Sequence, residues 1–474
     1  MKLGDRKHMW RVIVPAALIF SLPGLLVGFM IISLPPAMTV LVTSAAIISV
    51  QSLLGAALWS SRGRSGILVV ALAIAIAVLP EYSIDAFLSW LGGSPNSQAQ
   101  PEYILAPILG GSRMLLGVAW PLVMGALLLN RRRGGGNSRG VPGFELSILL
   151  LATLYLFTIY FKGHLWLMDA PVLLMLTAFY LWKALGRKDA VLGRPAALNG
   201  TRHEDSLGPF ERNGVRRFEV QRSGGLPLYG SLAVLLFGAF VLIFVTQPFT
   251  QGLYLLAGEY GVDRFTLFQG VLPFISKLPL IVLVVVLAWR NRGEFAGSIM
   301  LNSHFAILAL AVALVPLAGL LRGMTPGVSD VILLDDRQSM ELLLTASQSL
   351  MAIVILAGPK ISWKGASALA VPFAFEWLAH GLLTPEADLA MVQGTIVVFY
   401  LIAAAALLLT DGSRMTVLTG ASVPGVRLRS RKPISEHVAT DVRHAAVTDD
   451  GELVASMAGS LGGRTVRESE PANP

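Results

Sequence analysis

Two acidic residues stand inside an apolar stretch of the chain that is long enough to cross a lipid bilayer. Glu81 directly follows Pro80, and Asp85 comes one helical turn later on the same face. A charged side chain at the bilayer centre costs about 2.5 to 3.5 kcal/mol on insertion scales, so such residues normally face a bundle interior or a water-filled cavity. The two acids therefore predict a path for an ion or a proton.

Cations and neutral oxygens recur in other apolar stretches of the sequence. We expect the primary ion-binding or coupling residues to be Glu81, Asp85, Ser112, Arg113, Ser276, Lys277 and Asn302. Secondary candidates are His304, Glu376 and His380. Glu376 and His380 are one turn apart, which suits either a proton relay or a structural pair. Arg113 and Lys277 cannot both stay unpaired in a low dielectric, so we expect at least one of them to pair with Glu81.

The composition indicates the kind of protein that must position these residues. Hydrophobic residues make up 54% of the chain and charged residues only 14%, and the mean hydropathy is +0.67. This balance predicts an all-α polytopic membrane protein. The net charge of +8 lies in short loops and tails, so the positive-inside rule explains it better than nucleic-acid binding does. The absence of cysteine excludes disulfides and thiolate chemistry.

Apolar runs of the length that crosses about 30 Å of hydrocarbon predict about twelve transmembrane helices. The predicted spans are 11–33, 37–59, 66–91, 104–129, 144–162, 165–184, 227–247, 265–289, 299–322, 340–358, 365–383 and 388–409. Basic residues gather in alternate loops, which places both termini in the cytoplasm. We divide the chain into N-terminal spans 1–65, a first repeat 66–184, a cytoplasmic linker 185–226, a second repeat 227–409 and a polar, disordered tail 410–474.

The polar segments recur in hairpins of opposite orientation. The first hairpin carries Leu79-Pro80-Glu81 and Gly111-Ser112, and the second carries 274–280 and Leu301-Asn302-Ser303. Two related hairpins with opposed topology predict an inverted repeat, whose site lies at the bilayer midplane where broken helices free backbone carbonyls. A six-plus-six division would also suit a major-facilitator-like solute transporter, which stays open as an alternative.

The order of these segments resembles the cation/calcium exchanger superfamily of sodium/calcium exchanger-like membrane proteins. Members carry Thr-Ser-Leu-Pro-Glu on one helix of each repeat and Gly-Ser-Asn on the next. Leu79-Pro80-Glu81 matches the first segment and Gly111-Ser112 matches the second, while 163–169 resembles the Gly-x-Leu-x-x-x-Asp opening of a later helix. The resemblance covers about 66–184 and 227–409, and it implies a divergent member.

The departures from the family pattern concern the ion site itself. The family holds its ions with one glutamate from each repeat plus neutral oxygens, but Leu280 stands where the second glutamate belongs. Arg113 replaces the amide of Gly-Ser-Asn, and Lys277 precedes Leu280 by one turn. Ca²⁺ takes six to eight oxygens and usually several carboxylates. The resemblance therefore implies a site that binds Na⁺ or H⁺ in preference to Ca²⁺.

These observations predict a secondary active cation antiporter in the plasma membrane, of the prokaryotic inner-membrane type. Glu81 is the candidate metal ligand or proton acceptor, with neutral oxygens from Ser112, Ser276 and Asn302, and Lys277 or Arg113 acts as an internal competing cation. The alternative within the same family is a non-transporting homologue that serves as a scaffold or regulator. The expected partners are the bilayer and inorganic cations, without nucleic acid; protein partners stay open.

Enzyme classes find little support in the sequence. It contains no GxxxxGK[ST] phosphate loop and no HExxH metal motif, and its seven histidines are scattered. We therefore expect neither an enzyme nor a cofactor beyond a transported cation, which would be Na⁺, H⁺ or Ca²⁺.

Overall fold

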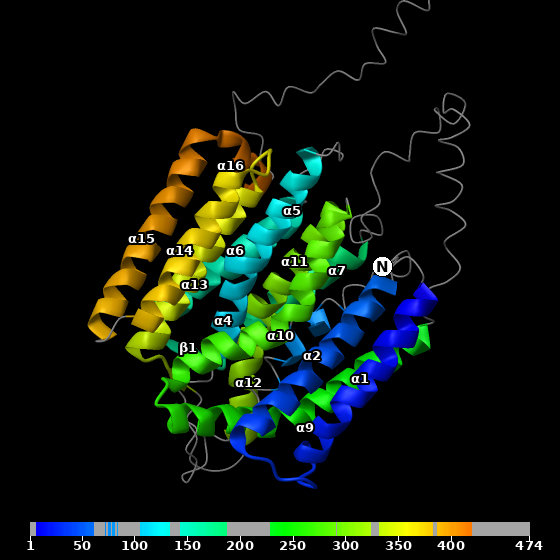
Figure 1. Cartoon of the computed structure of the whole chain (residues 1–474). Helices are drawn as coiled ribbons and strands as arrows, with labels where there is room; N and C mark the ends of the chain where they lie inside the picture. The colour runs from blue at the N-terminus through cyan, green and yellow to red at the C-terminus, as the bar shows by residue number, and fades with distance from the viewer. Residues whose placement is uncertain are drawn as a thin grey trace, which may run out of the picture. The chain divides into compact units, whose positions relative to one another are not determined.

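The chain forms a bundle of long apolar helices in a computed structural model (Figure 1). The structure describes residues 6–60, 105–132, 143–186, 228–290, 292–323, 331–382 and 386–419, together with 72, 74–76, 78–80 and 83. These residues all belong to a compact unit, Met1–Val423, and the second unit, Pro424–Pro474, lies outside the described residues.

The first half of the described chain contains six helices, a π-helical segment and one short strand. In chain order these are α1 (Arg6–Gly28), α2 (Pro36–Ser60), α4 (Ala106–Met114), η2 (Leu115–Ala119, π-helical), α5 (Trp120–Arg132), α6 (Gly143–Lys162), β1 (His164–Trp166) and α7 (Asp169–Gly186). Helix α4 continues through η2 into α5, so the three elements form one membrane-length rod.

The second half repeats this alternation of straight and π-helical segments. Its elements are α9 (Leu228–Tyr260), α10 (Arg264–Trp289), α11 (Gly293–Phe305), η5 (Ala306–Ala311, π-helical), α12 (Val312–Gly323), β2 (Val331–Leu333), α13 (Asp336–Leu356), α14 (Trp363–Leu382), α15 (Glu386–Thr410) and α16 (Gly412–Thr419). Strands β1 and β2 pair antiparallel, with His164 opposite Leu333, and so tie a loop of one half to a loop of the other.

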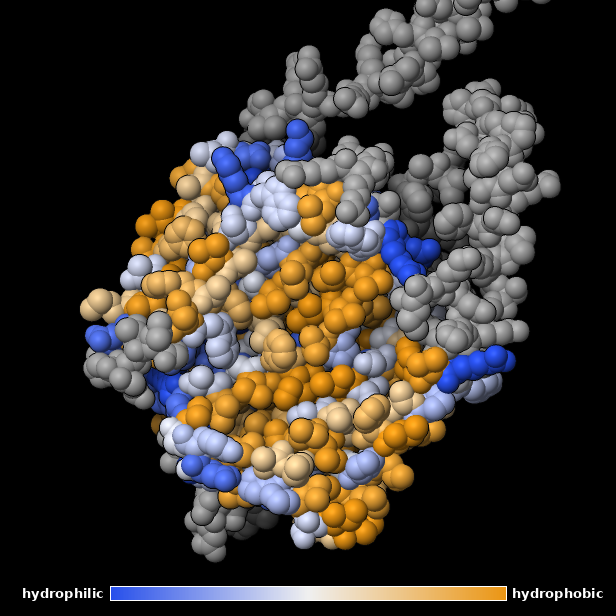
Figure 2. All heavy atoms as spheres, viewed as in Figure 1, coloured by the Kyte–Doolittle hydropathy of each residue, from blue (hydrophilic) through white to orange (hydrophobic). Residues whose placement is uncertain are grey.

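The helices follow the spans that the hydropathy pattern predicts. Nine helices in the described part are long and apolar enough to cross a membrane. Helices α7 and α14 occupy the positions of two further predicted spans, and the predicted span 66–91 lies almost entirely outside the described residues. The face in Figure 2 is largely apolar with hydrophilic side chains at its edges, as expected of a surface in contact with lipid.

Three helices pack together apart from the helices that carry the buried charges. Helix α2 packs against both α1 and α9, and α10 connects this group to the rest of the bundle (Figure 1). Helix α9 has 33 residues and contains Pro248. A helix of this length extends about 50 Å, well beyond a bilayer core of about 30 Å, so α9 must be tilted or bent if it crosses one.

The expected broken helices take a different form. Helix α10 stays continuous from Arg264 to Trp289 although it contains Pro273 and Pro279. Among the described helices, the irregular backbone lies in η2 and η5, which directly follow the polar segments of α4 and α11. A proline removes one hydrogen bond and kinks a helix, whereas a π-turn inserts a residue without ending it. Both devices disturb the helical ladder while the rod stays intact.

The first residues of the predicted polar tail are ordered. They form α16, whose Leu418 is buried and accepts a hydrogen bond at its carbonyl from the Ser147 hydroxyl of α6 at 2.6 Å. Arg414 also donates to the Val354 carbonyl at 2.6 Å. These contacts attach the helix to the bundle, so the ordered core extends past the predicted boundary at residue 410. Residues from 420 onward lie outside the described part.

Candidate functional site

Arg113 is buried between two carboxylates that come from different helices. Its guanidinium pairs with Glu341 of α13 and with Glu376 of α14, and all three side chains are at most 3% exposed. The Gln269 amide of α10 also donates to Glu341, and the Gln393 amide of α15 donates to Glu341 Oε1 at 2.6 Å. Buried charges are tolerated only when they are paired and hydrogen-bonded, and this cluster meets that condition for Glu341.

Helix ends position the cluster near one end of the bundle. Its side chains lie within the first three turns of α4, α10, α13 and α15, and within the last two turns of α14. Helix α13 begins at a capping box in which Asp335 accepts from the Gln338 backbone N–H at 2.6 Å. Helix N-termini carry partial positive charge, so they favour the carboxylate of Glu341 in the second turn of α13.

A second ion pair at this end joins the starts of α10 and α13. Asp263 caps α10 by accepting from the Thr266 backbone N–H, and Arg337 donates to it at 2.6 Å. Burial alone would raise the pKa of Asp263, but the hydrogen bonds from Arg337 and Thr266 outweigh burial and hold that pKa below its ordinary value. The carboxylate therefore stays ionised and keeps the two helix starts together.

Glycines let α14 approach the helices that carry Arg113 and Gln269. Phe373 lies against Gly117 of η2, and Trp377 lies against Gly270 of α10, so closely that a Cβ at either glycine would collide with the ring. The Arg113 guanidinium also lies 6.0 Å from the centre of the Phe373 ring. Helix α14 therefore packs closely against η2 and α10 at these two glycines, on the side of α14 that also carries the buried Glu376.

His380 is the fourth titratable member of the cluster, and its side chain is 5% exposed. Its Nδ1 lies 3.0 Å from the backbone carbonyl of Glu376, and its Nε2 lies 3.8 Å from Glu341 Oε1. Carboxylate and imidazole atoms of Glu341, Glu376 and His380 lie within 4.8 Å of one another, a spacing that could also suit a metal ion. Within the described residues, Gln269 Oε1, Glu376 Oε1 and His380 Nε2 have no hydrogen-bond partner.

A second polar cluster lies deeper in the bundle and begins next to Arg113. Ser112 Oγ lies 3.4 Å from His304 Nδ1, and His304 Nε2 lies 3.1 Å from Ser349 Oγ. All three side chains are fully buried, on α4, α11 and α13. The two neighbouring residues Ser112 and Arg113 thus connect α4 to two different polar clusters.

The other predicted site residues of the second half are also buried. Lys277 is fully buried on α10, so it does not extend to the membrane surface. Ser276 donates to the Pro273 carbonyl at 3.2 Å, and its oxygen can still accept. Asn302 is 3% exposed, and its Oδ1 has no hydrogen-bond partner among the described residues. Helix α10 packs against both α4 and α11, so these side chains lie on adjoining helices.

Glu81 and Asp85 lie outside the described residues. Their predicted convergence with Ser112, Ser276, Lys277 and Asn302 therefore stays a prediction. Arg113 pairs with Glu341 and Glu376, and its expected relation to Glu81 stays a prediction. Glu376 Oε1 lies 3.9 Å from His380 Nδ1, so the two side chains are neighbours, and their role as a proton relay or a structural pair stays a prediction.

The sequence does not predict three members of the Arg113 cluster. Glu341 stands at the edge of the predicted span 340–358, where a charged residue is ordinary. Gln269 and Gln393 are uncharged, so they give no signal within an apolar stretch. The capping sequence Asp335 to Gln338 was the available clue, because it starts α13 early enough to carry Glu341 inside.

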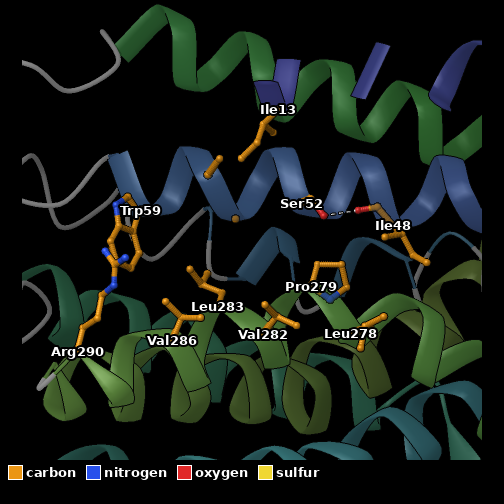
Figure 3. A pocket seen from close by; sticks show the side chains of 12 residues that line it. Ile13, Ile48, Ser52, Trp59, Leu278, Pro279, Val282, Leu283, Val286 and Arg290 are labelled. Carbon is orange, nitrogen blue, oxygen red and sulfur yellow. Dashed lines mark hydrogen bonds between the residues drawn. The ribbon is translucent and has the colours of Figure 1, made fainter. Parts of the chain in front are cut away.

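A separate cavity of about 350 Å³ lies along the seam between α2 and α10, with Ile13 of α1 at its side (Figure 3). Its walls are mostly aliphatic, including Ile48, Val282 and Leu283. Its polar groups are few, and the Ser52 hydroxyl is turned to the Ile48 carbonyl at 2.7 Å. This lining suits acyl chains better than an ion.

Comparisons place this helical arrangement among membrane exchangers. No protein-family model and no curated protein matches the sequence. The structure is similar to the crystal structure of the H⁺/Ca²⁺ exchanger CAX, with a TM-score of 0.67 and 26% identity over 88% of this chain and 97% of that one. It is also similar to native YfkE, with a TM-score of 0.53 and 14% identity over 77% of this chain and 100% of that one.

The bundle of apolar helices with a buried polar interior defines a multi-pass membrane protein. The chain has the fold of the cation/calcium exchanger superfamily, at low sequence identity to its solved members. The structure therefore does not have the major-facilitator fold that the sequence left open as an alternative.

Proposed function

We propose that the protein is a secondary active cation antiporter of the exchanger type, with H⁺ as one of the exchanged ions. The observation that carries this proposal is the likeness to an H⁺/Ca²⁺ exchanger over 97% of that chain at 26% identity. The buried polar groups around α4, α10 and α11 support it, because such groups are costly inside a membrane bundle and commonly mark an ion or proton path.

The ion that exchanges with H⁺ is proposed to be monovalent, with Na⁺ as the first candidate. Glu81 supplies one carboxylate, and Ser112, Ser276 and Asn302 supply neutral oxygens beside the cation of Lys277. This donor set is poor for Ca²⁺, which usually gathers several carboxylates. It suits an ion of lower charge, whose arrival at Glu81 competes with the ammonium group of Lys277.

Flux measurements in proteoliposomes test the proposal. We expect an imposed gradient of Na⁺ to drive proton movement, reported by an internal pH dye, while K⁺ and Ca²⁺ drive less. Glu81→Gln should abolish the flux because the site loses its carboxylate. Glu259→Gln, at the exposed end of α9, is the matched control and should keep it. Absence of proton movement with all three cations in the wild type would contradict the proposal.

A non-transporting homologue is the second candidate function. It is favoured by the basic residues Lys277 and Arg113, which are buried where the family has neutral or acidic ligands. Thermal unfolding separates the two candidates, because an ion that binds only the folded state raises the melting temperature. A transporter should be stabilised by increasing Na⁺ relative to a large organic cation at equal ionic strength, whereas a site filled by its own lysine should not.

A further inference from the structure

The Arg113 cluster contains an unbalanced charge. Glu341 and Glu376 bring two negative charges and Arg113 brings one positive charge, so the buried group is anionic when His380 is neutral. One additional positive charge would neutralise it, and a proton supplies that charge. A divalent cation would overcompensate unless Arg113 moved away.

The hydrogen bonds of His380 determine where a proton can bind. A backbone carbonyl can only accept, so the contact with Glu376 O at 3.0 Å assigns the hydrogen to His380 Nδ1. In the neutral imidazole, Nε2 then presents a lone pair to Glu341 Oε1 at 3.8 Å, and two acceptors face each other. A proton on Nε2 converts this unfavourable approach into a charge-assisted contact.

We propose that His380 binds the coupling proton on Nε2, in competition with Arg113 for the carboxylates of Glu341 and Glu376. The proposal rests on the proposed function, and it assigns the coupling proton to His380, whereas Glu81 is the candidate ligand of the exchanged cation. His380 lies in the last turn of α14, where the helix C-terminus favours a cation. When Arg113 holds both carboxylates, burial disfavours the imidazolium; when Arg113 withdraws from one of them, the imidazolium replaces it.

The surroundings of His380 support this exchange of partners. Among the described residues, the charged groups that act on it are Glu376 on its own helix, Glu341 from α13 and Arg113 from α4, with Asp263 and Arg337 farther away at the end of the bundle. Helix α15 contributes only the neutral amide of Gln393 to Glu341. The site therefore has one mobile charge, the proton, and one tethered charge, the guanidinium.

The position of Arg113 relates the proton site to the deeper cluster. Ser112, the preceding residue, contacts His304, and the π-helical segment η2 begins just after Met114. The residues that contact the two clusters are therefore neighbours on α4, directly before a π-helical segment. Single π-turns often mark functional sites in helices, in keeping with a movable segment here.

Two transport modes measured on the same proteoliposomes test the proposal. Proton-driven uptake requires proton binding, whereas exchange of labelled Na⁺ for unlabelled Na⁺ at equal pH does not. His380→Gln should lose proton-driven uptake in larger proportion than self-exchange, and its uptake should lose its pH dependence. His164→Gln, at the half-buried first residue of strand β1, is the control and should match the wild type in both modes.

A milder variant keeps the test valid if His380→Gln does not fold. Gln393→Met preserves side-chain shape but removes the amide that donates to Glu341 Oε1. Glu341 Oε1, which faces His380 Nε2, then has no competing amide donor and pairs more strongly with the imidazolium, so the midpoint of proton-driven uptake should move to higher pH. An unchanged midpoint in Gln393→Met, or equal losses in both modes for a folded His380→Gln, would overturn the proposal.

A wild type that moves no Na⁺ in either mode refutes the proposed function instead. The proton site is then tested by ¹⁵N NMR of histidine-labelled protein. One imidazole should carry a fixed hydrogen on Nδ1 and titrate at Nε2, and its signals should be missing from His380→Gln. If those signals show no titration, the proton site is refuted independently of transport.

Discussion

Arg113 holds together more buried charge than any other residue whose contacts are described above. It is the shared partner of two carboxylates from separate helices, and its surroundings exclude water. A complete buried charge pair contributes little net stability, because the desolvation cost offsets the attraction. Removal of one member is nevertheless strongly destabilising, because the other charge stays buried without a partner. The consequence of losing Arg113 should therefore be large and unlike that of losing an exposed arginine.

Replacing Arg113 with methionine should destabilise the fold by roughly 3 to 5 kcal/mol, the usual cost of an uncompensated buried charge. The control is Arg337→Met, whose ion pair with the half-exposed Asp263 should be worth at most about 1 kcal/mol. Adding Glu376→Gln to Arg113→Met should recover part of the loss. Denaturant titration in detergent micelles measures all three, and equal effects at Arg113 and Arg337 would contradict this account.

The sequence predicts this site only where a charge interrupts an apolar run. Arg113, Glu376 and His380 are visible for that reason, and the pairing of the last two follows from their spacing on one helix. Glu341 is not visible, because hydropathy places it at a span boundary. The partners of Arg113 depend on which helices pack against α4, and the local hydropathy pattern does not contain that information.

At the scale of elements, the crossing of α4 with α10 fixes the cluster. Gly110 lies so close to the backbone of Gln269 that a Cβ there would collide with the Gln269 carbonyl. This approach puts the Gln269 side chain beside Glu341, one of the two carboxylates that pair with Arg113. A single small residue thus determines the distance between a helix of the first half and one of the second.

Gly110→Ala should force α4 and α10 apart and destabilise the bundle by about 1 to 3 kcal/mol, as overpacking typically does. It should also weaken the hydrogen bond between Gln269 and Glu341. Gly394→Ala on α15 is the matched control, because nothing lies within 4 Å of the added carbon. That substitution should be neutral or slightly stabilising, since alanine favours helix. Unfolding midpoints of the two variants should therefore differ, and coincident midpoints would mean that the crossing can relax.

Hydropathy locates most of the elements but not their internal form. Predicted spans such as 265–289 and 388–409 coincide with α10 and α15 within a few residues. The length of α9 is underpredicted, because the polar residues after Thr246 end the apolar window although the helix continues. The π-helical segments η2 and η5 have no counterpart in the hydropathy pattern, because both consist of apolar residues like those of a regular membrane helix.

At the scale of the whole molecule, the Arg113 cluster lies between the two halves of the chain. One member comes from α4 in the first half, and the others come from α10, α13, α14 and α15 in the second. Any movement of one half against the other must therefore break or rearrange these contacts. The orientation of the bundle in the membrane decides which side of the cell the cluster faces.

The distribution of basic loops predicts that both termini are cytoplasmic and that the cluster lies near the outer surface. The chain contains no cysteine, so single cysteines can report this without background labelling. Val262→Cys, in the exposed loop before α10, should react with a membrane-impermeant maleimide in intact cells. Lys360→Cys, in the exposed loop before α14, should react only after permeabilisation. The reverse labelling pattern would invert the bundle, and the proton site at His380 would then face the cytoplasm.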